Sequence, residues 1–141
     1  MNEREVRDVA ARLHSSAIRL LRTLRREDDG SGLSAPRLSA LSVIVFAGPL
    51  SLAELAAAEQ VKPPTMSRIV YALVERGLVT RIAKPGDRRS VEIEATKEGS
   101  QLLDAGRERR VHALIGRLRK LADSERRALA RGVEILERMT R

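Results

Sequence analysis

Residues 51–77 read SLAELAAAEQVKPPTMSRIVYALVERG, and they specify the architecture more strongly than any other segment. Ser51 and Glu54 form a capping box, in which the serine oxygen and the glutamate carboxylate each satisfy an unpaired backbone donor, so a short helix is predicted to begin here. Pro63 supplies the fixed dihedral that suits a first helical turn, and a second helix is predicted to run from Pro63 to Arg76. Two short helices that meet across a tight turn are typical of a helix-turn-helix unit.

The helix predicted from Pro63 has two chemically different faces. Its apolar residues recur at helical spacing and form one stripe, made of Met66, Ile69, Val70, Leu73 and Val74. The other side chains are hydroxyl groups and one arginine, namely Thr65, Ser67, Arg68 and Tyr71. Such groups can read base edges or hold phosphates, and an arginine can contact guanine through two hydrogen bonds. The helix is therefore a candidate recognition helix; the alternative is a surface helix with ordinary solvated polar residues.

After this helix the sequence changes from a helical period to a period of two. Residues 78–83 and 91–95 alternate along the chain, which predicts a two-stranded hairpin. Its tip is Lys84-Pro85-Gly86-Asp87-Arg88-Arg89, a tight turn from which long arginine side chains can reach a narrow minor groove. A basic turn by itself is usually only solvated. This one directly follows the candidate recognition helix, so both features would face one ligand.

Long helical segments flank this central unit. An apolar stripe with arginines on the other faces predicts a first helix over residues 3–26, which the run of Asp, Gly and Ser at 28–32 ends. The segment 35–46 is apolar nearly all round, so this helix belongs in the centre of the core. Thr96 suits the N-cap of a long helix, and a last helix is predicted to begin at about residue 123.

These elements predict a mainly α fold with a small β-hairpin wing: a winged helix-turn-helix with long N- and C-terminal dimerisation helices. Residues 1–141 are expected to form a single domain, in which 34–96 are the DNA-binding region and 1–33 and 97–141 are the dimerisation helices. The terminal helices carry more apolar surface than one small winged unit can cover. We therefore expect a homodimer.

Composition restricts the function classes. The chain has 27 Lys and Arg against 19 Asp and Glu, a formal charge of +8, and a pI near 11.1. This balance favours a polyanionic partner, although a positive charge can serve solubility alone. The absence of cysteine excludes disulfides, thiolate catalysis and iron–sulfur clusters. Tyr71 and Phe46 are the only aromatic residues, too few to stack single-stranded bases, whereas duplex binding stays open.

Neither an enzyme nor a membrane protein is expected. His14 and His112 fall on separate predicted helices without metal-ligand spacing, and there is no glycine-rich phosphate loop, so no catalytic residue, metal or cofactor is predicted. The first residues are polar, and no stretch approaches ~18 consecutive apolar residues. The expected location is the cytoplasm, with no membrane partner.

Several segments together resemble the multiple antibiotic resistance regulator (MarR) family of winged helix-turn-helix regulators. They are residues 51–56 (SLAELA), 61–70 (VKPPTMSRIV), 73–79 (LVERGLV), 87–90 (DRRS) and 95–99 (ATKEG). The resemblance spans essentially the whole chain, flanking helices included. It implies a homodimer in which the first helix and the last two interlock and hold two winged regions over a pseudo-palindromic operator.

Carried over by position, the resemblance also implies roles for single residues. Thr65, Ser67 and Arg68 would contact the groove. Arg89 would be the wing arginine, and Asp87 would orient a nearby arginine. The residue between them, Arg88, stands at a position that varies in the family.

Two departures from the family pattern bear on packing and on sensing. Ala95 stands where the family usually has leucine, so looser packing is expected at the base of the wing. The missing cysteine removes the thiol oxidation that some relatives use, so if the protein senses a signal, the signal is expected to be a small molecule. The resemblance implies a crevice for it between the dimerisation helices and the winged region, with Leu13, Leu20 and Leu41 as candidate lining residues.

The function predicted from the sequence is that of a sequence-specific regulator of transcription that binds double-stranded DNA. We expect a homodimeric repressor that a small-molecule effector could release, with an affinity that falls steeply with salt. The predicted DNA-contacting residues are Lys62, Pro63, Thr65, Ser67, Arg68, Tyr71, Lys84, Asp87, Arg88 and Arg89. The alternative is a winged-helix module that binds proteins and does not read DNA.

Overall fold

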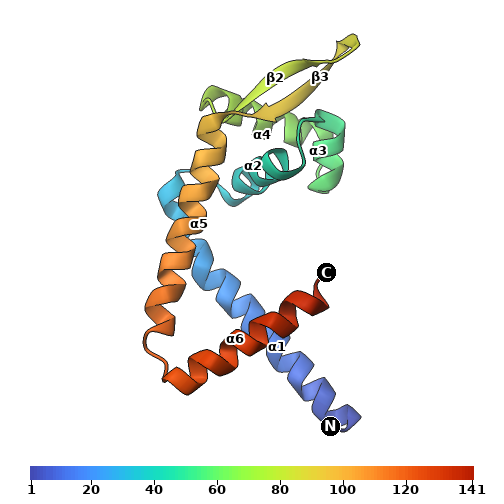
Figure 1. The fold of residues 1–141 in the computed structure, drawn as a ribbon. Coiled ribbons are helices and arrows are strands. Elements are labelled where there is room, and N and C mark those ends of the chain that lie inside the picture. Colours follow the sequence, from blue (N-terminus) through green and yellow to red (C-terminus); the bar gives the residue numbers. More distant parts are fainter.

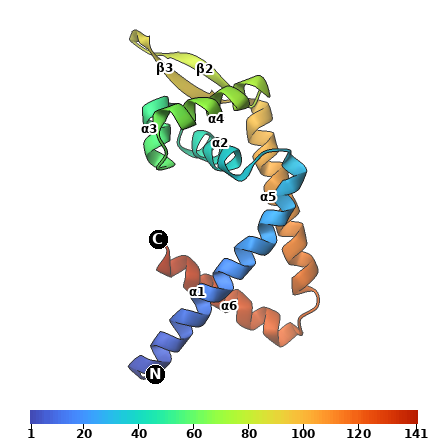
Figure 2. The ribbon, with the colours of Figure 1, turned by 180° about the vertical axis from the view of Figure 1, so that it is seen from behind.

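A computed structural model describes the backbone of residues 1–141 and every side chain other than that of Arg88. The elements in chain order are α1 (Glu3–Arg25), the 3-10 helix η1 (Arg26–Ser31), α2 (Ala35–Ala47), β1 (Leu50–Ser51), α3 (Leu52–Ala58), α4 (Pro63–Glu75), β2 (Val79–Lys84), β3 (Asp87–Ala95), α5 (Lys97–Leu118) and α6 (Asp123–Met139). The molecule is elongated: the winged unit, α2 to β3, lies at one end of α5, and α1 and α6 extend at the other (Figure 1; Figure 2, from behind). This is the mainly helical winged fold that the sequence predicts.

A single apolar core holds the winged unit together. Its largest wholly buried side chains come from α2, α3 and α4, and they are Leu41, Ile44, Leu55, Met66, Val70 and Leu73. Among the described side chains none that is polar or charged is buried. The prediction that α2 lies in the centre is confirmed for most of its length, but Phe46 near its end is 81% exposed. Burial of apolar surface is therefore the main force that fixes the position of α4.

A three-stranded antiparallel sheet closes one side of this core, in the order β1-β3-β2. The predicted hairpin is confirmed, with Val79 opposite Ala95 and Arg81 opposite Ile93. Ala95 is half-buried and packs against the core. The third strand, β1, was not predicted, because two residues are too few to show an alternating pattern.

The start of α5 is joined tightly to the turn that follows α4. The Thr96 hydroxyl donates to the Gly77 carbonyl at 2.6 Å and accepts from the Gly99 amide at 3.1 Å, so it caps the helix as predicted. A Cβ at Gly99 would lie 2.1 Å from the Leu78 carbonyl oxygen. Only glycine therefore lets the two backbones come this close.

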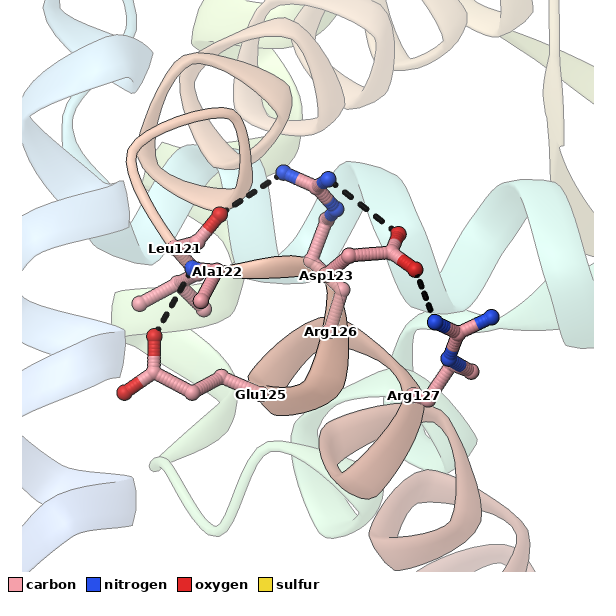
Figure 3. Close-up of polar contacts among 6 residues, drawn as sticks. All are labelled: Leu121, Ala122, Asp123, Glu125, Arg126 and Arg127. Atoms are coloured by element: carbon pink, nitrogen blue, oxygen red, sulfur yellow. Dashed lines mark hydrogen bonds and ion pairs between the residues drawn. The ribbon is translucent and has the colours of Figure 1, made fainter.

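The α5–α6 junction is a sharp elbow held by charged groups (Figure 3). Asp123 pairs with Arg126 at 3.2 Å and also with Arg127, while Arg126 donates to the Leu121 carbonyl at 2.7 Å. The Ala122 amide donates to the Glu125 carboxylate at 2.8 Å and so caps the first turn of α6. These contacts stabilise the first turn of α6, and the Arg126 bond joins it to the end of the α5–α6 linker.

Two further findings concern classes of site that the sequence disfavours. Among the described residues, no group of His, Asp or Glu is arranged to hold a metal ion. In the part of the chain that the structure describes, no single helix is long and apolar enough to cross a membrane; by length and composition one pair of segments passes, Glu3–Ser31 with Ala35–Ala47, and it is bent by 87°.

Candidate nucleic-acid interface

Helix α4 begins at the tight turn after α3, and its start is open to solvent. Lys62 is the N-cap residue and Pro63 the first helical residue, as predicted, and no side chain caps this end. Because Pro63 and Pro64 lack an N–H group, Thr65 is the first residue within the helix whose backbone amide can donate to a ligand. The positive end of the helix dipole attracts anions, and at this helix start the Thr65 amide and the Lys62 side chain are the groups that could add to that attraction.

The two faces of α4 are divided as the sequence predicts. Met66, Val70 and Leu73 are buried, and Ile69 and Val74 pack partly buried against them. The polar side chains on the other faces are all exposed, namely Thr65, Ser67, Arg68 and Tyr71. Tyr71 is the largest of them with 59% of its surface exposed. The outer surface of α4 thus presents hydroxyl groups and a guanidinium, with an apolar anchor behind them.

The wing tip is more irregular than a simple hairpin. Ala83 pairs with Val91, but the next residue, Lys84, pairs with Asp87, so residues 88–90 bulge out of β3 without a partner on β2. Pro85 and Gly86 form the turn between the paired ends. The bulge contains the Arg-Arg-Ser sequence, so Arg88 and Arg89 lie on backbone that leaves the ladder, whereas Lys84 stays paired in it.

The Asp87 carboxylate, at the start of β3, accepts hydrogen bonds from two residues of this bulge. It accepts a hydrogen bond from the Ser90 hydroxyl at 2.8 Å and one from the Arg89 backbone amide at 3.0 Å. The Ser90 bond first, and then the Arg89 bond, hold the pKa of Asp87 below its ordinary value of 3.8. Among the described contacts Asp87 fixes the backbone that carries Arg89. Its expected role in orienting a nearby arginine side chain stays a prediction, because the Arg88 side chain lies outside the described residues.

The predicted wing residues lie on the surface. Lys84, Asp87 and Arg89 are exposed, and the side chain of Arg88 lies outside the described residues. In Figure 1 the tip projects past α3, at the end of the winged unit opposite to α5. Their contacts with DNA stay predictions.

The sequence did not predict a role for two arginines on or next to α4, Arg81 and Arg76. Arg81 of β2 is exposed and lines a hollow of about 240 Å³ with Ser67 of α4 and Val91 of β3, so the wing and α4 share one concave surface. The strand alternation could have placed Arg81 on this side of the hairpin. Arg76, at the end of α4, binds η1, and no local sequence pattern indicates that contact.

The candidate effector residues do not come together. Leu41 is wholly buried in the core, whereas Leu13 lines a shallow hollow formed by α1 alone and Leu20 is exposed on α1. A cleft of about 720 Å³ does lie where the arms meet the winged unit, between η1, α2 and α5. Its walls include Asp28, Leu38 and Arg110.

Comparison with known proteins agrees with this geometry. The sequence profile of the MarR family matches residues 33–91. An uncharacterized HTH-type transcriptional regulator of Mycobacterium bovis is 34% identical over 128 residues, which are 91% of this chain and 90% of that protein. The HTH-type transcriptional repressor NicR of Pseudomonas putida is 40% identical over 75 residues, about half of each chain (50% and 48%).

A solved structure shares the fold over nearly the full length. A mutant of the S. aureus MepR protein, bound to an oligodeoxyribonucleotide, superposes with a TM-score of 0.73 at 15% identity and covers 94% of this chain and 98% of its own. At this identity the likeness shows the fold alone. Together with the profile match and the long mycobacterial alignment, it completes the assignment: the chain belongs to the MarR family of winged helix-turn-helix transcriptional regulators.

Proposed function

We propose that two copies of this chain bind one duplex operator, with each α4 in a major groove and each wing against the flanking backbone. The observation that carries this proposal is the division of α4, whose inner face packs into the core through Met66, Val70 and Leu73 while Thr65, Ser67 and Arg68 are exposed on the outside. A helix held in this way can enter a groove without loss of core contacts. The DNA-bound state of MepR supports the same use of the fold.

The apolar arms support a homodimer. Neither α1 nor α6 has a buried residue in the single chain, although both are strongly amphipathic. Their exposed apolar residues are Val6, Val9, Leu13, Ile18, Leu20 and Leu21 on α1, and Leu129, Val133, Ile135, Leu136 and Met139 on α6. Helices with this pattern gain stability only when the stripe is covered, and a second copy offers the complementary surface.

Repression would follow from occupancy. A dimer whose two recognition helices read half-sites about one helical turn apart, ~10 bp, covers its operator and blocks other proteins there. The similarity to NicR, which is named a repressor, supports this direction of control.

The test is selection of bound duplexes from a random pool, followed by affinity measurements at two salt concentrations. We expect a palindromic consensus and an affinity that falls steeply with salt, because each neutralised phosphate releases counterions. Arg68→Ala and Arg89→Ala should weaken binding with the fold intact. The matched control is Arg37→Ala, an exposed arginine of α2 that makes no hydrogen bond or ion pair among the described contacts.

The opposite result would favour the protein-binding alternative. If selection enriched no sequence, and if the parent and both variants showed the same weak affinity for any duplex, the groove-reading role of α4 would be refuted.

We propose further that a small-molecule effector binds in the cleft between η1, α2 and α5. This cleft lies at the joint between arms and winged unit, so a bound molecule could alter the angle between them. Ser39 is an exposed wall residue, and Ser39→Trp would fill the space. The variant should bind the operator like the parent but resist compounds that release the parent in a fluorescent-duplex screen; equal release of both proteins would place the effector elsewhere.

A further inference from the structure

The C-terminal end of α4 is held by an arginine that does not point to the outer face. Arg76 follows α4 as its C-cap residue, and its Nη1 donates to the Gly32 carbonyl at 2.8 Å. Its Nη2 donates to the Ser31 carbonyl at 3.4 Å. Both acceptors lie more than 40 residues away, since the sequence separations are 44 and 45. One side chain thus joins the recognition helix to the end of η1.

The chemistry of the acceptor site matches a guanidinium. The carbonyls at the end of a helix carry the negative end of its dipole, which attracts a cation. Two neighbouring carbonyls suit the planar fork of an arginine better than the single ammonium of a lysine. Gly32 has φ of 70°, and a Cβ there would lie 3.3 Å from Arg76 Nη1, so the guanidinium packs closely against the bare Cα.

The 3-10 helix η1, whose end binds Arg76, is itself joined to α5. Arg109 Nε donates to the Glu27 carbonyl at 3.1 Å, and Arg110 forms an ion pair with Asp28, both on η1. The start of α5 holds the neighbouring residue of the recognition unit through the bond from Thr96 to Gly77. Arg76 and Gly77, the two residues that follow α4, are therefore both hydrogen-bonded to the frame formed by α1, η1 and α5.

We propose that Arg76 is a positioning residue for operator recognition: it touches no base, and it fixes the tilt of α4 relative to the dimerisation frame. This role rests on the proposed dimeric function. At ~1.5 Å per residue α4 is about 20 Å long, so a tilt of about 10° at its end moves its start by about 3 Å, close to the rise of one base pair. Arg76 would therefore set the spacing of half-sites that the dimer accepts.

The experiment compares the parent with Arg76→Ala, Arg76→Lys and the control Arg37→Ala. Each protein is titrated with the selected operator and with versions whose half-sites are one base pair closer or farther apart, at several salt concentrations. We expect both Arg76 variants to lose about fivefold or more in affinity for the parent spacing, to discriminate less between spacings, and to keep the salt slope of the parent. Arg37→Ala should keep the parent preference for spacing.

The possible results distinguish a failure of the positioning role of Arg76 from a failure of the proposed DNA-binding function. Full recovery by Arg76→Lys, with a salt slope lower by about one in Arg76→Ala, would make Arg76 a phosphate contact and overturn its positioning role. Unchanged spacing preference in both variants would overturn that role as well. Failure of the parent to bind any duplex would overturn the proposed function itself and the role of Arg76 with it. Arg76→Lys keeps the charge and helix propensity, so it decides the question if Arg76→Ala does not fold.

Discussion

The winged unit and the terminal arms use the same kinds of apolar residues in opposite ways. In the winged unit, side chains such as Leu41, Leu55 and Met66 have no exposed surface, and helices from separate parts of the sequence enclose them. In α1 and α6 the apolar residues form stripes as regular as those of any core helix, yet none is buried. The winged unit buries its apolar side chains within the chain, whereas the apolar stripes of α1 and α6 stay exposed in the single chain, as the proposed dimer requires.

This difference separates what each region contributes to stability. The winged unit should keep its structure when the arms are altered, because its core contains no residue from α1 or α6. The arms should depend on protein concentration, because their apolar faces can be covered only by association. Variants in the two regions should therefore respond to different measurements.

Truncation in the core should have the greatest consequence. Leu41→Ala should lower the free energy of unfolding by about 2–5 kcal/mol, because it leaves a cavity among side chains that have no exposed surface. Urea denaturation measures this loss. The control is Phe46→Ala on the same helix, an exposed position where a change within about 0.5 kcal/mol is expected. A small effect of Leu41→Ala would show that Leu41 is free to line a ligand site instead.

A charge on the arm should separate the dimer and spare the winged unit. Val133→Glu places a carboxylate on the apolar stripe of α6, twice in a symmetric dimer, and should weaken association by about 100-fold or more, roughly 3 kcal/mol. Arg131→Glu, on the opposite side of α6 by its 3.6-residue period, should leave the dimer intact. Light scattering over a concentration series measures both. If Val133→Glu and the parent dimerised over the same range of protein concentration, the assigned interface would be contradicted.

Within the winged unit, two kinds of DNA contact should be separable. Arg68→Ala should cost about 1–3 kcal/mol and relax the sequence preference at one operator position, because an arginine on the outer face of α4 can read a guanine edge. Lys62→Ala should weaken binding to all duplexes alike and reduce the salt slope by about one, as expected of a phosphate contact. Fluorescence anisotropy with operator variants distinguishes the two. If both variants changed the sequence preference and the salt slope in the same way, the assignment of Arg68 to a base contact and of Lys62 to a phosphate contact would be contradicted.

The wing should show a smaller, local effect that leaves both regions folded. Because the pKa of Asp87 is lowered in the folded wing, its hydrogen bonds stabilise the bulge above that pKa and weaken as the pH falls through it. Ser90→Ala removes the main cause of the shift, so the pKa should rise toward 3.8. An NMR titration of the Asp87 carboxyl measures this, with Ser39→Ala as the control that should not change it. If the pKa of Asp87 in Ser90→Ala equalled that of the parent, the hydrogen bond from the Ser90 hydroxyl to Asp87 would be contradicted.

The sequence was sufficient where local patterns determine structure. The faces of α4, the cap at Thr96 and the pairing of the hairpin all depend on residues within a few positions of one another. Helix ends also agree closely: the first helix was predicted to reach residue 26 and ends at Arg25.

What the sequence could not predict depends on contacts across long separations or on irregular backbone. Arg76 with Gly32, and Arg110 with Asp28, are brought together only when α2 and α5 pack on the rest of the fold. The bulge at residues 88–90 breaks the alternation that predicted the hairpin, so the partners of Asp87 could not be identified from spacing. The candidate effector residues failed to converge for a related reason: a leucine at helical spacing carries no information on which partner will cover it.

The position of Tyr71 has a practical consequence. The chain has no tryptophan and a single tyrosine, and that tyrosine lies on the exposed surface of α4. When light that phenylalanine does not absorb is used for excitation, the intrinsic ultraviolet emission therefore comes from α4 alone. Quenching of this emission would report groove occupancy in the unlabelled protein, with no dye attached and no residue replaced.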